Sequence, residues 1–144
     1  MSVQSYDTIG PFRDDFFIDG IDHEYCLRAR SKGYRVLLAL APHLVHSVGH
    51  RQVKRVLPGL HVVTVNHAPF RWYTMVRNRL IIVREYAGRE PSWTASRALR
   101  LVVKCAQTLT FEQERLDKAR CMALGLADFV SKRKVRHPVE LIRD

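Results

Sequence analysis

Apolar residues recur at helical spacing through most of the second half of the chain. Between residues 68 and 86 they form a stripe of Phe70, Tyr73, Val76, Leu80 and Val83. Proline is tolerated in the first turn of a helix, where Pro69 lies. This pattern predicts a helix over 68–86.

Two further helices are expected after the Gly88 to Pro91 break, which is the most plausible hinge in the chain. Ser92 is expected to cap the first, with an inward face of Leu99, Val102, Val103 and Ala106. A Thr-x-x-Gln capping box at 110–113 is expected to open the second, which extends to about residue 131. Its expected inward residues are Leu116, Ala119, Met122, Ala123 and Leu126. A frayed tail follows from Pro138.

The first half of the chain predicts one helix and several short strands. The helix covers about 20–32, with Asp19 as its N-cap and Gly33 as its stop. The apolar run at 34–40 is typical of a strand buried on both faces, and 43–47 and 61–65 favour further extended segments. Residues 1–18 are expected to form a loop that enters a short strand or turn, and the basic stretch 50–60 is expected to be irregular. The fold class is therefore α/β.

Charge is unevenly distributed along the 144 residues, which carry a net charge of +10. Residues 51–109 hold eleven Lys/Arg and two acids, so most of the excess lies there. Such a segment suits a polyanion, although a solvated basic face without a partner explains it equally well. The alternative function is a basic nucleic-acid-binding or membrane-docking module without catalysis. No helix-turn-helix, zinc-finger or RNP motif supports the nucleic-acid form.

The three cysteines have no zinc-like spacing and are expected to be reduced. Neither a signal peptide nor an apolar run of about 20 residues is visible. We therefore expect a cytoplasmic protein, at most peripheral on the inner membrane.

Three spaced acids, Asp19, Asp22 and Glu24, stand at the start of the predicted 20–32 helix. A carboxylate held at a helix start beside a loop is what a general base requires. The structural alternative makes Asp19 a cap and pairs Glu24 with Arg28, four residues on.

Three motifs resemble those of inverting family 2 glycosyltransferases with a GT-A fold. The first is Gly-x-Phe-x-x-x-Phe-Phe-Ile-Asp-x-x-Asp-x-Glu at 10–24, which is most similar to the rhamnosyltransferase branch. The second is Leu-Val-His-Ser-Val-Gly at 44–49, and the third is Arg-x-Tyr-x-x-x-Arg-Asn at 71–78. They occur in the family's order, and the likeness covers about residues 6–95.

The resemblance implies the C-terminal half of a GT-A-type fold, with few short strands and an acidic-motif helix, followed by a helical tail. Residues 1–88 would form the acceptor-side part and 89–144 the helical extension. A family member would be about twice as long, and the Asp-x-Asp metal motif of its nucleotide-binding half is absent here. We therefore expect a fragment that is inactive alone.

The resemblance also implies residue roles. Asp22 would be the catalytic base, and Asp19, Glu24 and Arg28 would bind acceptor, although for Glu24 the ion pair with Arg28 is favoured. His46 would approach metal or diphosphate. A divalent metal, Mg or Mn, is expected in the complete enzyme and none on this chain alone. The donor would be dTDP-rhamnose or a similar nucleotide sugar, and the acceptor a glycan or lipid-linked glycan of cell-envelope polysaccharide synthesis.

Two groups of residues keep alternative interpretations. Arg77 and Asn78 contact diphosphate or lipid, or else Arg77 pairs with an acid such as Glu85 and Asn78 caps a loop. Arg97, Arg100 and Lys104 share one helix face. That face suits an anionic membrane, with a solvated surface as the alternative.

Overall fold

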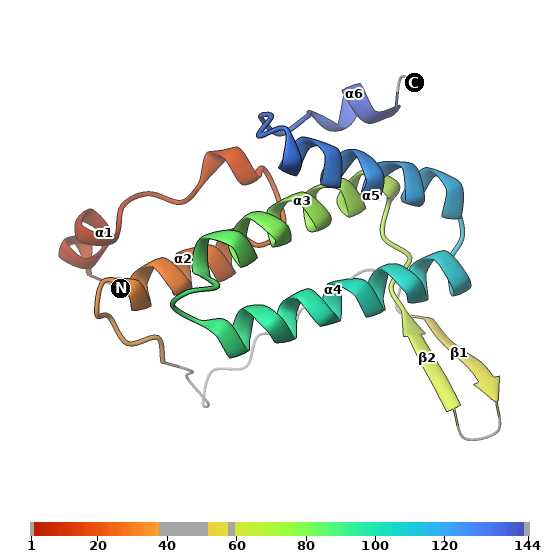
Figure 1. Ribbon diagram of the computed structural model, residues 1–144, viewed down its shortest axis with the longest axis horizontal. Coiled ribbons are helices and arrows are strands. Elements are labelled where there is room, and N and C mark those ends of the chain that lie inside the picture. The colour runs from red at the N-terminus through yellow and green to blue at the C-terminus, as the bar shows by residue number, and fades with distance from the viewer. Residues whose placement is uncertain (1, 38–51, 58–59, 143–144) are drawn as a thin grey trace.

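The computed structural model describes residues 2–37, 52–57 and 60–142. Three long helices dominate the described part: α3 (Pro69–Tyr86), α4 (Pro91–Phe111) and α5 (Arg115–Val130). Helix α3 lies between the other two (Figure 1) and contacts both. The expected 68–86 helix is confirmed as α3. The GT-A half-fold itself stays a prediction.

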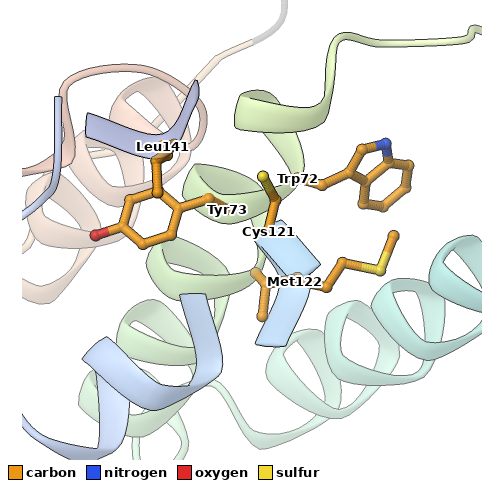
Figure 2. Packing of buried hydrophobic residues seen from close by; sticks show 6 residues of the cluster. Trp72, Tyr73, Cys121, Met122 and Leu141 are labelled. Carbon is orange, nitrogen blue, oxygen red and sulfur yellow. The ribbon is translucent and has the colours of Figure 1, made fainter. Parts of the chain in front are cut away.

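Helix α3 is buried around most of its circumference because it packs on neighbours on several sides. Trp72, Tyr73 and Ile82 are almost completely enclosed. On the α5 side the core joins Trp72 and Tyr73 to Cys121 and Met122, and Leu141 closes it (Figure 2). A buried helix of this kind organises the elements around it.

The N-terminal segment of the chain also packs on α3, and its apolar contacts lie toward the C-terminal end of that helix. The segment contains α1 (Val3–Ile9), a 3₁₀ turn (Asp14–Phe16) and α2 (Ile21–Ser31). Phe16 and Leu27 enter a second core with Ile81, Ile82 and Tyr86. The predicted 20–32 helix is confirmed. The loop predicted for 1–18 is wrong for α1, which Ser2 caps by accepting a bond from the amide of Ser5.

The two described strands form an antiparallel hairpin, β1 (Gln52–Leu57) and β2 (Leu60–Thr64), with Val53 opposite Val63. The hairpin projects beyond the helices, and β2 contacts α4 (Figure 1). The strand expected at 61–65 is confirmed. The irregular structure expected at 50–60 is wrong for the two strand segments, because β1 pairs with β2.

The predicted strand at 34–40 is not formed in its described part. Val36 and Leu37 belong to no strand and are exposed. The rest of that run, and the extended segment expected at 43–47, lie outside the described residues.

The inward face predicted for α4 is wrong. Leu99, Val102 and Val103 are exposed, whereas the enclosed side of the helix carries Thr94, Leu101, Cys105 and Thr108. Its N-cap is Glu90 rather than Ser92. The helix is apolar on its outer side as well, so apolar periodicity alone selected the wrong face.

The helix predicted to extend to about residue 131 is confirmed as α5, and its predicted inward residue Met122 is buried. Leu116 and Leu126, also predicted to point inward, are exposed, while Lys118, Cys121, Gly125 and Asp128 are buried. The predicted capping box at 110–113 is wrong because α4 continues to Phe111. Beyond α5, the expected frayed tail contains a short helix, α6 (Pro138–Ile142), whose Leu141 is buried. None of the helices among the described residues combines the length and the hydropathy that a membrane span requires.

Candidate functional site

The loop that leads into α2 is held by one side chain of α3. Asn78 Nδ2 donates to the carbonyl oxygens of Phe16, Ile18 and Asp19 at 2.9, 2.8 and 3.0 Å. Phe17 and Asp19 adopt positive φ angles of 58° and 66°. Such strained backbone persists only where its surroundings hold it. Asn78 therefore positions the acidic segment, residues 19–24, which carries Asp19, Asp22 and Glu24.

Arg77, the residue before Asn78 on α3, also binds backbone carbonyls of neighbouring segments. Its guanidinium donates to the carbonyl oxygens of Asp15 and Arg133 at 3.1 and 3.0 Å and to the side chain of Asn78 at 2.9 Å. Arg77 is 4% exposed and Asn78 1%. Neither is available to diphosphate or lipid in this structure. The acid considered as a partner, Glu85, pairs instead with Arg13.

Asp19 does not cap α2, and the sequence prediction is wrong on this point. The N-cap is Gly20, in the left-handed conformation and without a side-chain hydrogen bond. The Asp19 carboxylate turns toward α3, where Arg71 donates to both of its oxygens and Thr74 donates at 3.0 Å. Asp19 thus ties the start of α2 to α3.

Glu24 is also occupied within the fold. Its carboxylate accepts a hydrogen bond from the Tyr86 hydroxyl at 3.0 Å and lies 3.2 Å from the Arg28 guanidinium. Burial raises the pKa of Tyr86, and the Glu24 charge raises it further. Arg28 also donates to the carbonyl of Pro11 at 2.7 Å. The favoured Glu24–Arg28 ion pair is confirmed.

Asp22 differs from the other two acids. Its side chain is 81% exposed, and its described partner is His23 Nδ1 at 3.1 Å. It lines two open clefts, one of about 460 Å³ that faces α3 and one of about 690 Å³ beside Trp93. Asp19 also lines the α3-side cleft, but its carboxylate is held by Arg71 and Thr74. Asp22 is therefore the most exposed of the three carboxylates and, among the described residues, the one without a hydrogen-bond partner on α3.

Arg79 faces Asp22's α3-side cleft and was not singled out from the sequence. It follows Arg71 and Met75 at four-residue intervals, so these three share one side of α3, and Met75 and Arg79 line the cleft. Arg79 makes no hydrogen bond or ion pair with the described residues. Burial, together with the nearby charge of Arg97, lowers its pKa. The sequence signal that could have found Arg79 is its spacing of two helical turns from Arg71, which places both arginines on the same side of the predicted helix.

This arrangement offers two chemical services. An exposed carboxylate in the first turn of a helix can accept a proton from a bound hydroxyl. A guanidinium without a carboxylate partner can bind a phosphate or another anion through its fork of donors. Asp19 and Glu24 lie on either side of Asp22 in the sequence, and Arg71 and Arg28 hold them in place. The backbone that carries Asp22 is therefore fixed on both sides.

The structure leaves the predicted metal-approaching residue untested. His46 lies outside the described residues. Among residues that the structure does describe, no group of three His, Cys, Asp or Glu side chains is placed to hold a metal ion.

The three basic residues of α4 line a groove next to the Asp22 cleft. Arg97 is half-buried with its guanidinium 5.1 Å from the centre of the Trp93 ring, and Arg100 and Lys104 are exposed. All three border a cavity of about 480 Å³ between α3 and α4, which Arg79 also lines. The structure thus confirms their shared face and adds a fourth cation.

Comparison with known proteins supplies one informative likeness. No family model and no solved structure matches the chain. The dTDP-rhamnosyl transferase RfbF of Shigella flexneri is 31% identical over 85 residues. The matched region covers 59% of this chain and 27% of that transferase, so the chain matches only about a quarter of its relative's length. The similarity indicates a glycosyltransferase-like relationship.

Proposed function

We propose that this chain supplies the acceptor-side cleft of an inverting, nucleotide-sugar-dependent glycosyltransferase. The observation that carries the proposal is the exposure of Asp22 at the edge of two clefts, while Asp19 and Glu24 are bound within the fold. The similarity to a rhamnosyl transferase supports the reaction class, and rhamnosyl transfer from dTDP-rhamnose is the narrower form.

The chemistry assigned to Asp22 is general base catalysis. An acceptor hydroxyl in the cleft donates a hydrogen bond to the carboxylate. As the hydroxyl oxygen bonds to the anomeric carbon, its proton passes to Asp22 and the nucleoside diphosphate leaves with the electron pair of the broken bond. Attack opposite the leaving group inverts the anomeric configuration. Asp19, Arg71 and Asn78 act as positioning residues because they hold the turn before Asp22.

The remaining components belong to the same proposal. The fold would be the acceptor-side half of a GT-A domain, with 1–88 and 89–144 as its two parts. A bound Mg or Mn would neutralise the departing diphosphate. Its ligands would lie beyond the described residues, with His46 as this chain's candidate. A glycan or lipid-linked glycan of the cell envelope would be the acceptor, at the cytoplasmic side of the inner membrane.

The test is Asp22→Asn in the chain combined with a nucleotide-binding half, assayed for transfer from labelled dTDP-rhamnose to lipid-linked glycan. We expect turnover to fall by at least ~100-fold, since the base is lost. The unfolding temperature should be unchanged, because the Asp22 side chain is largely exposed. Asp7→Asn is the matched control, since Asp7 is an exposed acid on α1 away from the clefts. Wild-type turnover in the Asp22→Asn protein would refute the assignment.

A further inference from the structure

The groove between α3 and α4 combines cations with apolar surface. Its volume is about 480 Å³, and four basic residues line it: Arg79 from α3, and Arg97, Arg100 and Lys104 from α4. Apolar side chains lie between them, among them Met75, Leu101 and Val103. The groove can therefore contact a charged group and a hydrocarbon chain at once.

The groove itself holds an excess of positive charge, and the nearest acids that act on it are Asp22 and Asp19, which face Arg79 from the adjoining cleft. No acidic residue lines the groove in the described part of the structure, and α4 contains no Asp or Glu along its whole length. The four cations form no hydrogen bond or ion pair with described residues. Arg79 and Arg97 are close enough for their charges to repel. A bound anion would relieve that repulsion, and a phosphate could accept donors from several of these side chains.

The apolar part of the groove continues onto the open surface of α4. Leu99 and Val103 are 66% and 46% exposed. Exposed apolar surface beside a row of cations, without acids, matches the two chemical parts of an amphiphilic anion. Neither inorganic phosphate nor a neutral hydrocarbon would use both.

The groove adjoins the cleft of Asp22. Met75 and Arg79 line both cavities, so a ligand long enough to pass Arg79 could contact α4 on one side and Asp22 on the other. An acceptor with a sugar attached to a lipid phosphate has this order of parts: hydrocarbon, phosphate, hydroxyl.

We propose that the α3–α4 groove binds a phosphate ester that carries a hydrocarbon chain, with its phosphate at Arg79, Arg97, Arg100 and Lys104. This inference rests on the proposed function in so far as the ligand is the acceptor, whose hydroxyl it places at Asp22. The same chemistry is available from one lipid-phosphate molecule or from the headgroups of an anionic bilayer.

Binding can be tested on the 144-residue chain through its tryptophan fluorescence, since Trp93 stacks with Arg97. The probe is farnesyl diphosphate, compared with inorganic diphosphate and farnesol. We expect saturable 1:1 binding of farnesyl diphosphate, at least tenfold tighter than either fragment. Arg79→Gln should weaken it tenfold or more. Arg100→Gln with Lys104→Gln should do the same, and these two exposed residues can change without disturbing the core. Arg89→Gln, an exposed cation outside the groove, is the control.

A vesicle arm separates the two sources of the ligand. Flotation with phosphatidylglycerol vesicles but no binding of soluble farnesyl diphosphate would assign the groove to a bilayer surface, and saturable soluble binding would assign it to a single lipid phosphate. The proposal is overturned if neither binds, if inorganic diphosphate binds as tightly as farnesyl diphosphate, or if the double variant binds like wild type. Binding without sugar transfer by the completed enzyme would refute the proposed function alone. Transfer without such binding would refute the groove alone.

Discussion

Single side chains near α2 show how similar residues acquire different roles. Asp19, Asp22 and Glu24 lie within six positions of one another. Arg71 and Thr74 hold Asp19, and Tyr86 and Arg28 hold Glu24, all from elements that pack against the acidic segment or from its own helix. Asp22 points outward. The division follows from where α3 lies, since α3 supplies most of these partners.

Asn78→Ala should destabilise the protein by about 3 kcal/mol, because the carbonyls of Ile18 and Asp19 lose their described donor and buried polar groups are costly to leave unpaired. The Phe16 carbonyl keeps the Ile18 amide as a donor. Urea unfolding followed by circular dichroism measures the change. Gln113→Ala, at an exposed position between α4 and α5, is the control. A loss below about 0.5 kcal/mol for Asn78→Ala would contradict the anchoring role, since surface substitutions commonly stay in that range.

Asp128 should make stability depend on acid pH. Hydrogen bonds from Arg136, at 2.7 and 3.0 Å, lower the pKa of this carboxyl, and the Tyr73 hydroxyl adds to the effect while burial opposes it. The folded-state pKa is therefore below the unfolded value of about 3.9. The stabilisation is complete above the unfolded pKa and is lost as the pH falls through the folded one.

The corresponding measurement is urea unfolding of wild type and Asp128→Asn between pH 3 and pH 7. We expect the difference in unfolding free energy to be largest near neutral pH and to shrink below about pH 4. A difference that stays constant over this range would show that the Asp128 charge does not contribute.

At the scale of elements, the contact between α3 and α5 decides how closely the helices approach. A Cβ atom added at Gly125 would lie 2.5 Å from the backbone oxygen of Tyr73. The same contact brings Tyr73 to Asp128 and to the core of Cys121 and Met122. Backbone proximity, rather than a left-handed conformation, thus requires glycine at this position.

Gly125→Ala should cost about 1–3 kcal/mol, because overpacking against backbone outweighs the roughly 1 kcal/mol gained in helix propensity. Gly88→Ala is the matched control, since its Cβ would meet no atom within 4 Å. We expect that control to change the unfolding free energy by less than about 0.5 kcal/mol. Thermal unfolding of both variants measures the difference, and equal effects would argue against the close helix contact.

A buried ion pair between Lys118 and Glu112 connects α5 with two connecting segments of the chain. Lys118 of α5 donates to Glu112 at 3.0 Å and to the Asn66 side chain at 2.7 Å, and the Asn66 amide donates to Glu112 at 3.3 Å. Lys118 is fully enclosed. The cluster connects α5 and the α4–α5 turn to the loop between β2 and α3.

Lys118→Met should destabilise the protein by about 3–5 kcal/mol, because it leaves the Glu112 carboxylate buried without its cation. Combining it with Glu112→Gln should recover much of this loss, since the uncompensated charge is removed. A double-mutant cycle in urea provides the measurement. If the double variant is less stable than Lys118→Met alone, the ion pair is not the source of the effect.

For the whole molecule, the net charge of +10 overstates the number of basic side chains that are free to contact a polyanion. Within the basic segment 51–109, Arg77 is buried and Arg71 is paired with Asp19. Arg79, Arg97, Arg100 and Lys104 gather instead at a groove with apolar side chains between them. This placement suits an amphiphilic anion better than the hydrophilic phosphate backbone of a nucleic acid.

We therefore expect duplex DNA to bind no tighter than about 1 µM at 150 mM salt, within the range of non-specific association. Fluorescence anisotropy with two unrelated 20-base-pair duplexes, over a series of salt concentrations, measures affinity and sequence preference. Tight binding with a preference for one duplex would instead favour the nucleic-acid interpretation.

Local sequence signals were enough to locate the longest helices and the segment that carries the acids. Helical periodicity and the proline and glycine positions are local signals, and they sufficed for α2 and α3. The Glu24–Arg28 pair, four residues apart on one helix, was predictable for the same reason. Which carboxylate remains exposed depends on long-range contacts, since Asp19 pairs with an arginine 52 positions away along the chain.

Which face of α4 is buried also depends on tertiary packing. Leu99 and Val103 are as apolar as any core residue, yet packing on α3 encloses Thr94, Leu101 and Thr108 instead. An amphipathic pattern states that a helix has two unlike faces, but not which neighbour each will meet. The α3–α4 groove therefore emerges only when α3 contributes Met75 and Arg79 to a surface that α4 shares.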